Sequence, residues 1–400
     1  MRPGGGARGR RLVRGTWRRF VAGGPRQAGG RSGAHGEGVW LAGLREAGSR
    51  SGICGAGVWL AGRNSPSPSG EVRVGVDWRQ MAEPLSVGLD LSGTKISAAV
   101  VDSAGRVLQR IRQPFQRLSF EESISEIVGA FEEVVAQCAV GANELSGSGI
   151  SIPGVYYSAT GNALAPDLWG WEQAGLWRAV EKALPAPVMV VNDRAASALG
   201  EQWVGAARGL SDVVFLSVGN TIGAGIISAG WILSGAGDLA GAAGWLAVDP
   251  RKKDQYKHVG SLEAEAAGPA IGRRAAAYIA LGEKTIMAGL AGSRPVNLDI
   301  VLEAARRGDG VAMRVLEETA TYLAMGVANL ISILNPEMVV LGGSVFQACE
   351  FLLEPLRREV REWVQPLAAS QVRIEVSHLG DDARVLGAAR MPLLAKAGSQ

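Results

Sequence analysis

A glycine-containing segment between two apolar runs, at residues 88–95, most constrains what this chain can fold into. It reads Gly-Leu-Asp-Leu-Ser-Gly-Thr-Lys and lies between residues 85–87 and the small, β-branched run 96–101. Short apolar runs on both sides of a glycine turn predict a strand, a tight turn and a second strand. Such a turn can direct backbone N–H groups and a threonine hydroxyl towards an anion. The segment therefore predicts a phosphate-binding hairpin.

Two other interpretations start from the same residues. Gly88 and Gly93 have the spacing of a Walker A loop, but that loop needs Gly-Lys-Ser/Thr and a following helix. Here Gly93-Thr94-Lys95 leads into a strand-like run, which supports a P-loop only weakly. An ordinary β-hairpin is common and stays open. On the phosphate interpretation, Asp90, Gly93, Thr94 and Lys95 would bind ATP, and Asp90 would hold Mg²⁺ through the water shell of the ion.

A second strand, glycine turn and strand, at residues 213–230, repeats this pattern. Such a duplication suits a clamp whose two lobes hold a phosphate chain from opposite sides. No dinucleotide fingerprint fits, because no helix follows the turn. A later strand, 338–341, ends in paired glycines that permit the close approach of adenine and ribose. The residues assigned to ATP on this basis are Gly219, Asn220, Thr221, Gly342 and Gly343.

Asn192 and Asp193 lie between a buried strand, 187–191, and a helix of small residues, 194–201. Ligands of open α/β sheets bind at the carboxyl ends of strands. A carboxylate there can accept the proton of an attacking hydroxyl in phosphoryl transfer. Asparagine and aspartate are equally typical of a helix N-cap, and the two roles are compatible.

Asp167 lies in a loop beside Trp169 and Trp171. Aromatic faces and a carboxylate suit a sugar, so Asp167 is a candidate for sugar binding. A surface loop anchored by tryptophan explains the same residues equally well. Elsewhere, helical spacing of apolar residues predicts helices over 262–281, 311–334 and 382–396.

Residues 1–80 differ in composition from the rest of the chain. They contain fourteen arginines, four acidic residues and no lysine, and they repeat Gly-Val-Trp-Leu-Ala-Gly at 38–43 and 57–62. Such a composition predicts a disordered segment. It could be a basic arm for nucleic acid or a targeting peptide, although it lacks an apolar region with a cleavage site. We favour a third interpretation, in which the natural protein starts at Met81, where the composition changes.

Composition excludes several classes of protein. No run approaches the roughly 20 apolar residues that span a bilayer, so no membrane association is expected. Cys54, Cys138 and Cys349 lie far apart, which argues against a disulfide framework and favours a cytoplasmic location. Three histidines are too few for a histidine-rich metal site.

Taken together, these segments resemble the ROK family of repressors and sugar kinases, over about residues 85–395. The resemblance rests mainly on residues 88–95, on Asn192-Asp193 before an alanine-rich helix, and on 334–337 leading to Gly342-Gly343. It implies an α/β fold of the two-lobed actin-like ATPase (ribonuclease H-like) type, with mixed sheets flanked by helices and an ATP and sugar cleft between the lobes. It further implies that Asp193 is the catalytic base, that Asn192 binds sugar hydroxyls, and that Glu263 is a sugar ligand.

The resemblance also implies an organisation and a set of partners. Residues 84–200 would form a small lobe completed by helix 382–396, and 201–381 a large lobe. ATP, Mg²⁺ and a sugar would be the ligands, and the chain would form a homodimer. Nucleic acid is not an expected partner, because residues 1–80 lack helix-turn-helix periodicity.

Departures from the family pattern concentrate on the sugar side. A glutamate and a histidine of the family correspond to Ala242 and Trp245 here. The family's structural zinc uses that histidine and three nearby cysteines, which are missing, so no structural zinc is expected. Two functions therefore stay open. One is an ATP-dependent sugar kinase with altered sugar specificity, and the other is a sugar-binding or regulatory protein with weak or no kinase activity.

Overall fold

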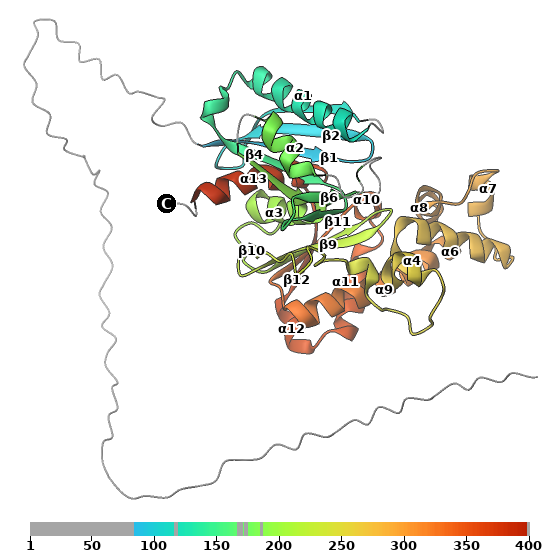
Figure 1. Cartoon of the computed structure of the whole chain (residues 1–400). Coiled ribbons are helices and arrows are strands. Elements are labelled where there is room, and N and C mark those ends of the chain that lie inside the picture. The colour runs from blue at the N-terminus through green and yellow to red at the C-terminus, as the bar shows by residue number, and fades with distance from the viewer. Residues whose placement is uncertain (1–83, 116–118, 166–170, 172–174, 185–186, 398–400) are drawn as a thin grey trace, which may run out of the picture. The chain divides into compact units, whose positions relative to one another are not determined.

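The computed structural model describes residues 84–115, 119–165, 171, 175–184 and 187–397 (Figure 1). All of them belong to one unit of the chain, Gly75–Gln400. Residues 1–80 and Asp167 lie outside the described residues, so the interpretations of the leader and of the tryptophan loop stay predictions.

The first sheet has the strand order β3-β2-β1-β4-β7. β1, β2 and β3 form an antiparallel meander, and β4 and β7 run parallel to β1. Alternate residues of β1 face opposite sides of the sheet: Val87 and Leu89 join a core with α1, whereas Gly88 faces α13. The elements are β1 (Leu85–Leu91), β2 (Lys95–Val101), β3 (Val107–Pro114), α1 (Phe120–Cys138), β4 (Leu145–Ile152), α2 (Leu176–Ala183) and β7 (Val188–Asn192).

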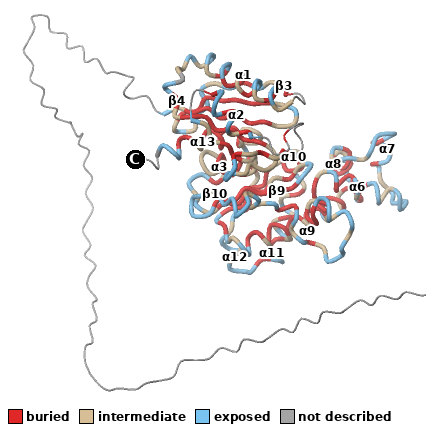
Figure 2. Tube along the Cα trace, in the orientation of Figure 1, coloured by how far each residue is buried: buried red, intermediate tan, exposed pale blue. Residues whose placement is uncertain are grey.

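The second sheet repeats this plan, with the order β10-β9-β8-β11-β12. β8 and β9 form an antiparallel hairpin, and β11 and β12 run parallel to β8. The predicted duplication of a glycine hairpin is therefore confirmed as the start of each sheet. Figure 2 shows buried residues running through both sheets. The strands are β8 (Val213–Val218), β9 (Ile222–Ser228), β10 (Trp231–Ile232), β11 (Met338–Gly342) and β12 (Arg373–Val376), and a small separate sheet contains β5 (Val155–Tyr157) and β6 (Asn162–Leu164).

Helices pack around the second sheet, and one prediction about them was wrong. Residues 262–281 form two helices because Pro269, in the first turn of the second, lacks the N–H that a continuous helix needs. The helix expected to stop before Pro336 does so, with Asn335 in the left-handed region (φ 44°). These helices are α4 (Tyr256–Val259), α5 (Ser261–Ala266), α6 (Gly268–Ala280), α7 (Met287–Ala291), α8 (Leu298–Arg306), α9 (Gly310–Leu334), α10 (Ser344–Ala348), α11 (Leu353–Trp363) and α12 (Pro366–Gln371).

The last helix, α13 (Asp382–Ala397), packs against α3 (Asp193–Val204) and against strands β1 and β4 of the first sheet. Glycines make this approach possible. A Cβ atom on Gly387 would lie 1.7 Å from the carbonyl oxygen of Ala196 in α3, and one on Gly149 would lie 1.8 Å from that of Ala388. The backbone of α13 is therefore in direct contact with the backbones of α3 and β4, and these contacts fix the position of α3.

Among the described helices, none combines the length and the apolar character that a bilayer-spanning segment needs.

Candidate active site

The turn between β1 and β2 forms the tight hairpin that the sequence predicts. The Ser92 N–H donates to the carbonyl oxygen of Lys95 (2.9 Å), and the Lys95 N–H donates to Ser92 Oγ (3.2 Å). Thr94 is exposed and Gly93 is half-buried at the tip of the turn. The turn therefore leaves the hydroxyl-bearing Thr94 accessible to a ligand, and its assignment to phosphate binding stays a prediction.

Asp90 lies one residue before the end of β1 and is 1 % exposed. Its Oδ1 accepts a hydrogen bond from Ser151 Oγ (2.8 Å), and its Oδ2 lies 3.0 Å from Nε of Arg384. Burial raises the pKa of Asp90 to about 6, and the Arg384 guanidinium opposes that shift. Without Arg384, the burial of this carboxylate would be far more costly.

Arg384, at the start of α13, belongs to a charge network that the sequence analysis did not identify. Its Nη2 lies 3.0 Å from Asp381 Oδ1, and the other oxygen of Asp381 is paired with Lys95. Lys95, predicted to contact ATP, therefore bonds to a carboxylate here. The only signal in the sequence was the acidic pair Asp381-Asp382 followed by an arginine, and nothing local links that segment to β1.

The residues around Asp90 suit a magnesium ion that arrives with a nucleotide. In the described ranges, no three histidine, cysteine, aspartate or glutamate side chains gather as a preformed metal site would need. Mg²⁺ bound to ATP usually keeps several waters and needs only one or two carboxylates. A carboxylate has about four lone-pair positions, so Asp90 keeps acceptor positions beside those used by Ser151 and Arg384, and its 1 % exposure means that such a water would have to enter the space around these side chains.

Asn192 and Asp193 stand at the junction of β7 and α3. The side chain of Asn192 caps the helix, because its Oδ1 accepts a hydrogen bond from the Ala195 N–H (2.8 Å). The capping role that the sequence suggested is confirmed. Asp193 is the first residue of the helix, with Oδ1 3.6 Å from Nε of Arg194. Burial raises the pKa of Asp193, while Arg194 and Arg384 oppose that shift.

Asp193 opens into a cavity of about 250 Å³, called here the Asp193 cavity. The cavity brings Asp193 together with Thr221 of the second hairpin and with Glu263 of α5, all predicted site residues. Ala242 and Trp245 also line it, and Trp245 is 57 % exposed. The remaining lining residues are Pro153, Gly154, Arg194, Ser217, Ile222 and Gly223.

Glu263 has a structural partner within this cavity. Its Oε2 accepts a hydrogen bond from the Ile222 N–H (2.7 Å), which ties α5 to the start of β9. Burial raises the pKa of Glu263, and the hydrogen bond from Ile222 and the charge of Arg194 oppose it. No hydrogen bond to its other oxygen, Oε1, is found among the described residues, so that oxygen is available to a ligand.

A larger cavity of about 730 Å³, the Asn220 cavity, lies on the other side of the second turn. Gly219 and Asn220 line it together with residues of α6 and α10. The carbonyl oxygen of Gly219 accepts a hydrogen bond from the Gly268 N–H (2.8 Å), which fixes the turn to the start of α6. Gly268, Pro269, Gly272, Arg273, Ala276, Pro295, Val296, Asn297, Leu298, Asp299, Ser344, Val345 and Ala348 complete the lining.

Gly342 and Gly343 border this region without lining the cavity. A Cβ atom on Gly343 (φ 87°) would lie 2.4 Å from the carbonyl oxygen of Val218, and one on Gly342 would lie 2.3 Å from Cζ of Phe215. Packing of β11 against β8 therefore explains both glycines. Their contact with adenine or ribose stays a prediction.

Comparison with known proteins places these features in a family. The model of the ROK family matches residues 86–395. A glucokinase of Thermotoga maritima is 31 % identical over 76 % of this chain and 95 % of its own length. A putative xylose repressor of a Caldicellulosiruptor species is 30 % identical over 77 % of each chain.

A solved structure agrees with these relatives. The ROK glucokinase of Streptomyces griseus, crystallised with glucose and AMPPNP, is 28 % identical over 77 % of this chain and 98 % of its own, with a TM-score of 0.62. The predicted two-lobed actin-like ATPase fold, with mixed sheets flanked by helices, is confirmed by this likeness and by the two sheets described above. The chain belongs to the ROK family.

Proposed function

We propose that this protein transfers the γ-phosphoryl group of ATP to a hydroxyl group of a sugar, with Asp193 as the general base. One observation carries the proposal: a single turn borders both cavities. Thr221 lines the Asp193 cavity, while its neighbours Gly219 and Asn220 line the Asn220 cavity. A phosphate chain lying across this turn would run from the larger cavity to the smaller one, where the sugar would bind.

The surroundings of Asp193 change its pKa in the direction that suits a general base. Its burial raises its pKa from the ordinary range of aspartate, which brings the carboxylate closer to the pKa suited to proton transfer. The charge of Arg194 opposes that rise, and Arg194 is itself held by a hydrogen bond from its Nη2 to the carbonyl oxygen of Gly154 (3.1 Å). Helix α3 packs closely against α13, and this packing holds the Asp193 carboxylate in position.

The cationic side chains near the first turn would act on the phosphates. Lys95 and Arg384 place two positive charges beside Asp90 and Asp381, at the end of the β1–β2 hairpin. A magnesium ion that arrives with ATP would neutralise part of the phosphate charge. Asp90 would orient a water of its shell, and Thr94 would donate its hydroxyl to a phosphate oxygen.

An ADP-release assay over hexoses and N-acetylhexosamines tests the proposal. Wild-type protein is expected to release ADP with at least one sugar, and Asp193→Asn to lose about two or more orders of magnitude of that rate. ATP binding, measured by calorimetry, should stay nearly unchanged. Asp254→Asn is the matched control, because the Asp254 side chain is 92 % exposed and lies outside both cavities. Unchanged turnover in Asp193→Asn would refute the assignment of the base.

The alternative function is a sugar-binding regulator with weak or no kinase activity. Ala242 and Trp245 favour it, because they line the Asp193 cavity where carboxylate and imidazole groups would otherwise contact a sugar. The xylose repressors among the relatives support it as well. Sugar binding by calorimetry without ADP release from any sugar would establish this alternative over the kinase.

A further inference from the structure

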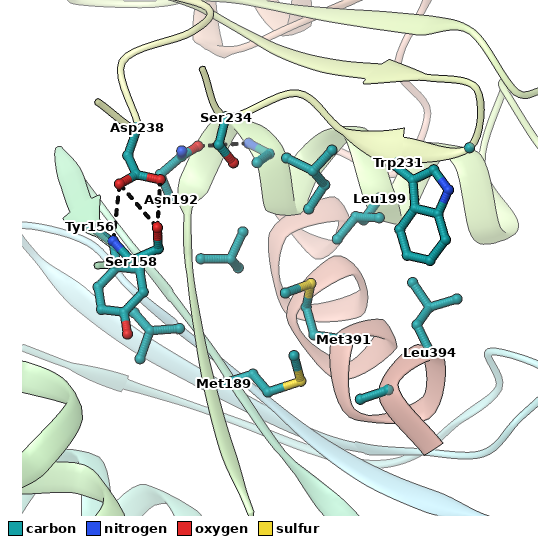
Figure 3. Close-up of a pocket in the computed structure, with 16 residues that line it drawn as sticks. Tyr156, Ser158, Met189, Asn192, Leu199, Trp231, Ser234, Asp238, Met391 and Leu394 are labelled. Carbon is teal, nitrogen blue, oxygen red and sulfur yellow. Dashed lines mark hydrogen bonds between the residues drawn. The ribbon is translucent and has the colours of Figure 1, made fainter. Parts of the chain in front are cut away.

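A third cavity, of about 460 Å³, lies apart from the two already described and shares no lining residue with them (Figure 3). We call it the Met189 cavity. β7, the edge strand of the first sheet, and β10, the edge strand of the second, both contribute to its wall. Residues of α3 and α13 also line it. The remaining lining residues are Tyr156 of β5 and the loop residues Ser158, Gly230, Ser234 and Asp238. The cavity therefore joins both sheets and the two helices between them.

Most of the wall is apolar. Met189, Leu199, Met391 and Leu394 face the cavity, and the indole of Trp231 stands at one end of it (Figure 3). Trp231 is 76 % exposed, which is unusual for so large an apolar side chain. A hollow of this volume lies within the roughly 300–1,000 Å³ typical of small-molecule sites.

The opposite end of the cavity carries a negative charge. Asp238 accepts hydrogen bonds from the N–H (3.0 Å) and from the hydroxyl (3.0 and 3.1 Å) of Ser158. Within the part of the chain that the structure describes, no lysine, arginine or histidine forms an ion pair with Asp238. Its backbone is held in the left-handed region (φ 56°). The carboxylate is therefore fixed at the rim without a cationic partner.

We propose that the Met189 cavity binds a small amphiphile with an apolar body and an ammonium head. The body would fill the space between Met189 and Met391 and lie against the Trp231 indole. The ammonium group would pair with Asp238, whose carboxylate has lone pairs left beside those used by Ser158. Charge complementarity at one end and apolar contact along the rest select this class over neutral or anionic compounds.

The junction of β7 and α3 borders both the Met189 cavity and the Asp193 cavity. Asn192 lines the Met189 cavity and caps α3, and the next residue, Asp193, lines the Asp193 cavity on the other side of that junction. We therefore expect a ligand that shifts β7 or α13 to shift Asp193 as well. Binding at the Met189 cavity is expected to alter the affinity for a ligand of the active site, and by linkage the reverse.

Calorimetric titration with 2-phenylethylammonium, at low ionic strength, tests the site. The isosteric neutral probe is 2-phenylethanol, and the anionic one is 3-phenylpropanoate. Asp238→Asn removes the charge while keeping a side chain that tolerates the left-handed region. Leu394→Trp fills the apolar end, and Leu394 is 37 % exposed, so the larger ring can be accommodated. Asp254→Asn is again the control, because Asp254 is an exposed aspartate that does not line the cavity.

The expected result is saturable binding of 2-phenylethylammonium that is at least tenfold weaker in Asp238→Asn, abolished in Leu394→Trp and unchanged in Asp254→Asn. The neutral probe should bind more weakly and equally to wild type and Asp238→Asn. Equal binding of all three probes, or no effect of either cavity variant, would overturn the proposal. So would a concentration-dependent dimer in sedimentation that Trp231→Ala dissociates, because a second copy would then occupy this face.

This test does not depend on the proposed kinase activity. Binding of the probe is measured without ATP or sugar. The coupling is read separately, as a shift in the calorimetric affinity for a hexose when the probe is present, and an unchanged affinity would refute the coupling. A protein that releases no ADP but binds the probe as described would refute the kinase and leave the site in place.

Discussion

Replacing Gly387 by alanine tests the packing that positions α3, the helix that begins at Asp193. Gly387 lies inside α13, where its missing side chain lets the backbone of α3 approach. A Cβ atom there would lie 1.7 Å from the oxygen and 2.5 Å from the carbon of the Ala196 carbonyl, and 2.9 Å from the backbone nitrogen of Gly200. All three contacts are to backbone atoms, so no side-chain rotation can relieve them and one helix has to move.

The magnitude follows from two opposing effects. Alanine in place of glycine inside a helix stabilises it by about 1 kcal/mol. Overpacking costs about 1–3 kcal/mol, and the upper end applies because the clash is with rigid backbone. The net expectation is a loss of about 2 kcal/mol. Gly129→Ala is the matched control, since Gly129 also lies inside a helix, α1, and a Cβ atom there would meet nothing within 4 Å. That variant should gain up to about 1 kcal/mol.

Urea unfolding followed by circular dichroism measures both variants, and the ADP-release assay provides an independent readout. Displacing α3 by about 1 Å would move Asp193 and lower the sugar-dependent rate by as much as about a hundredfold. Gly129→Ala should keep the wild-type rate. Equal stabilisation of the protein by both substitutions would refute the close packing of α13 on α3, and with it the account of how Asp193 is held.

Three further predictions concern the charges of the active site. Burial raises the pKa of Asp193, the proposed base, and a base acts only when it is ionised, so the sugar-dependent rate should fall as the pH is lowered, and at a higher pH than an ordinary aspartate would show. Arg194 and Arg384 limit this shift, and a rate that stays flat down to about pH 4 would contradict it. Arg384→Ala leaves Asp90 buried without its counter-charge and should lower the free energy of unfolding at neutral pH by about 3 kcal/mol. In urea unfolding, the double variant with Asp90→Asn should recover part of this stability, and additive losses from the two substitutions would contradict the pairing. Ala242→Glu adds a hydroxyl acceptor to the Asp193 cavity and should lower the KM for unsubstituted hexoses in the ADP-release assay; an unchanged or higher KM would show that this position does not contact the sugar.

The two glycine hairpins, the helix cap at Asn192 and the end of α9 at Asn335 could all be predicted from the sequence. Each of these depends on residues close together in the chain, because turns, caps and helix stops are made by local hydrogen bonds and backbone preferences. The break at Pro269 also has a local cause, and it was missed because apolar spacing continued across the proline.

Only part of the candidate site could be predicted from the sequence. Asp193 and Glu263 were expected in it, and the structure brings them into one cavity with Thr221. Their shared wall with Ala242 and Trp245 depends on how α5 and the segment after β10 fold onto β9, which no local pattern encodes. Asp167 lies outside the described residues, so its role as a sugar ligand stays a prediction.

Tertiary structure alone decided the electrostatics around the first hairpin. The sequence by itself determined that Asp90 would lie at the end of a strand, just before a glycine turn, whereas its burial is known only from the structure. That Arg384 would lie 3.0 Å from Asp90, and that Asp381 would hold Lys95, followed only when α13 packed against β1 and β4. The physical reason is that glycines in strands and helix admit a close approach between segments nearly 300 residues apart. Local sequence determines which side chains each helix or strand presents, and only the packing of these elements determines which charged groups come together.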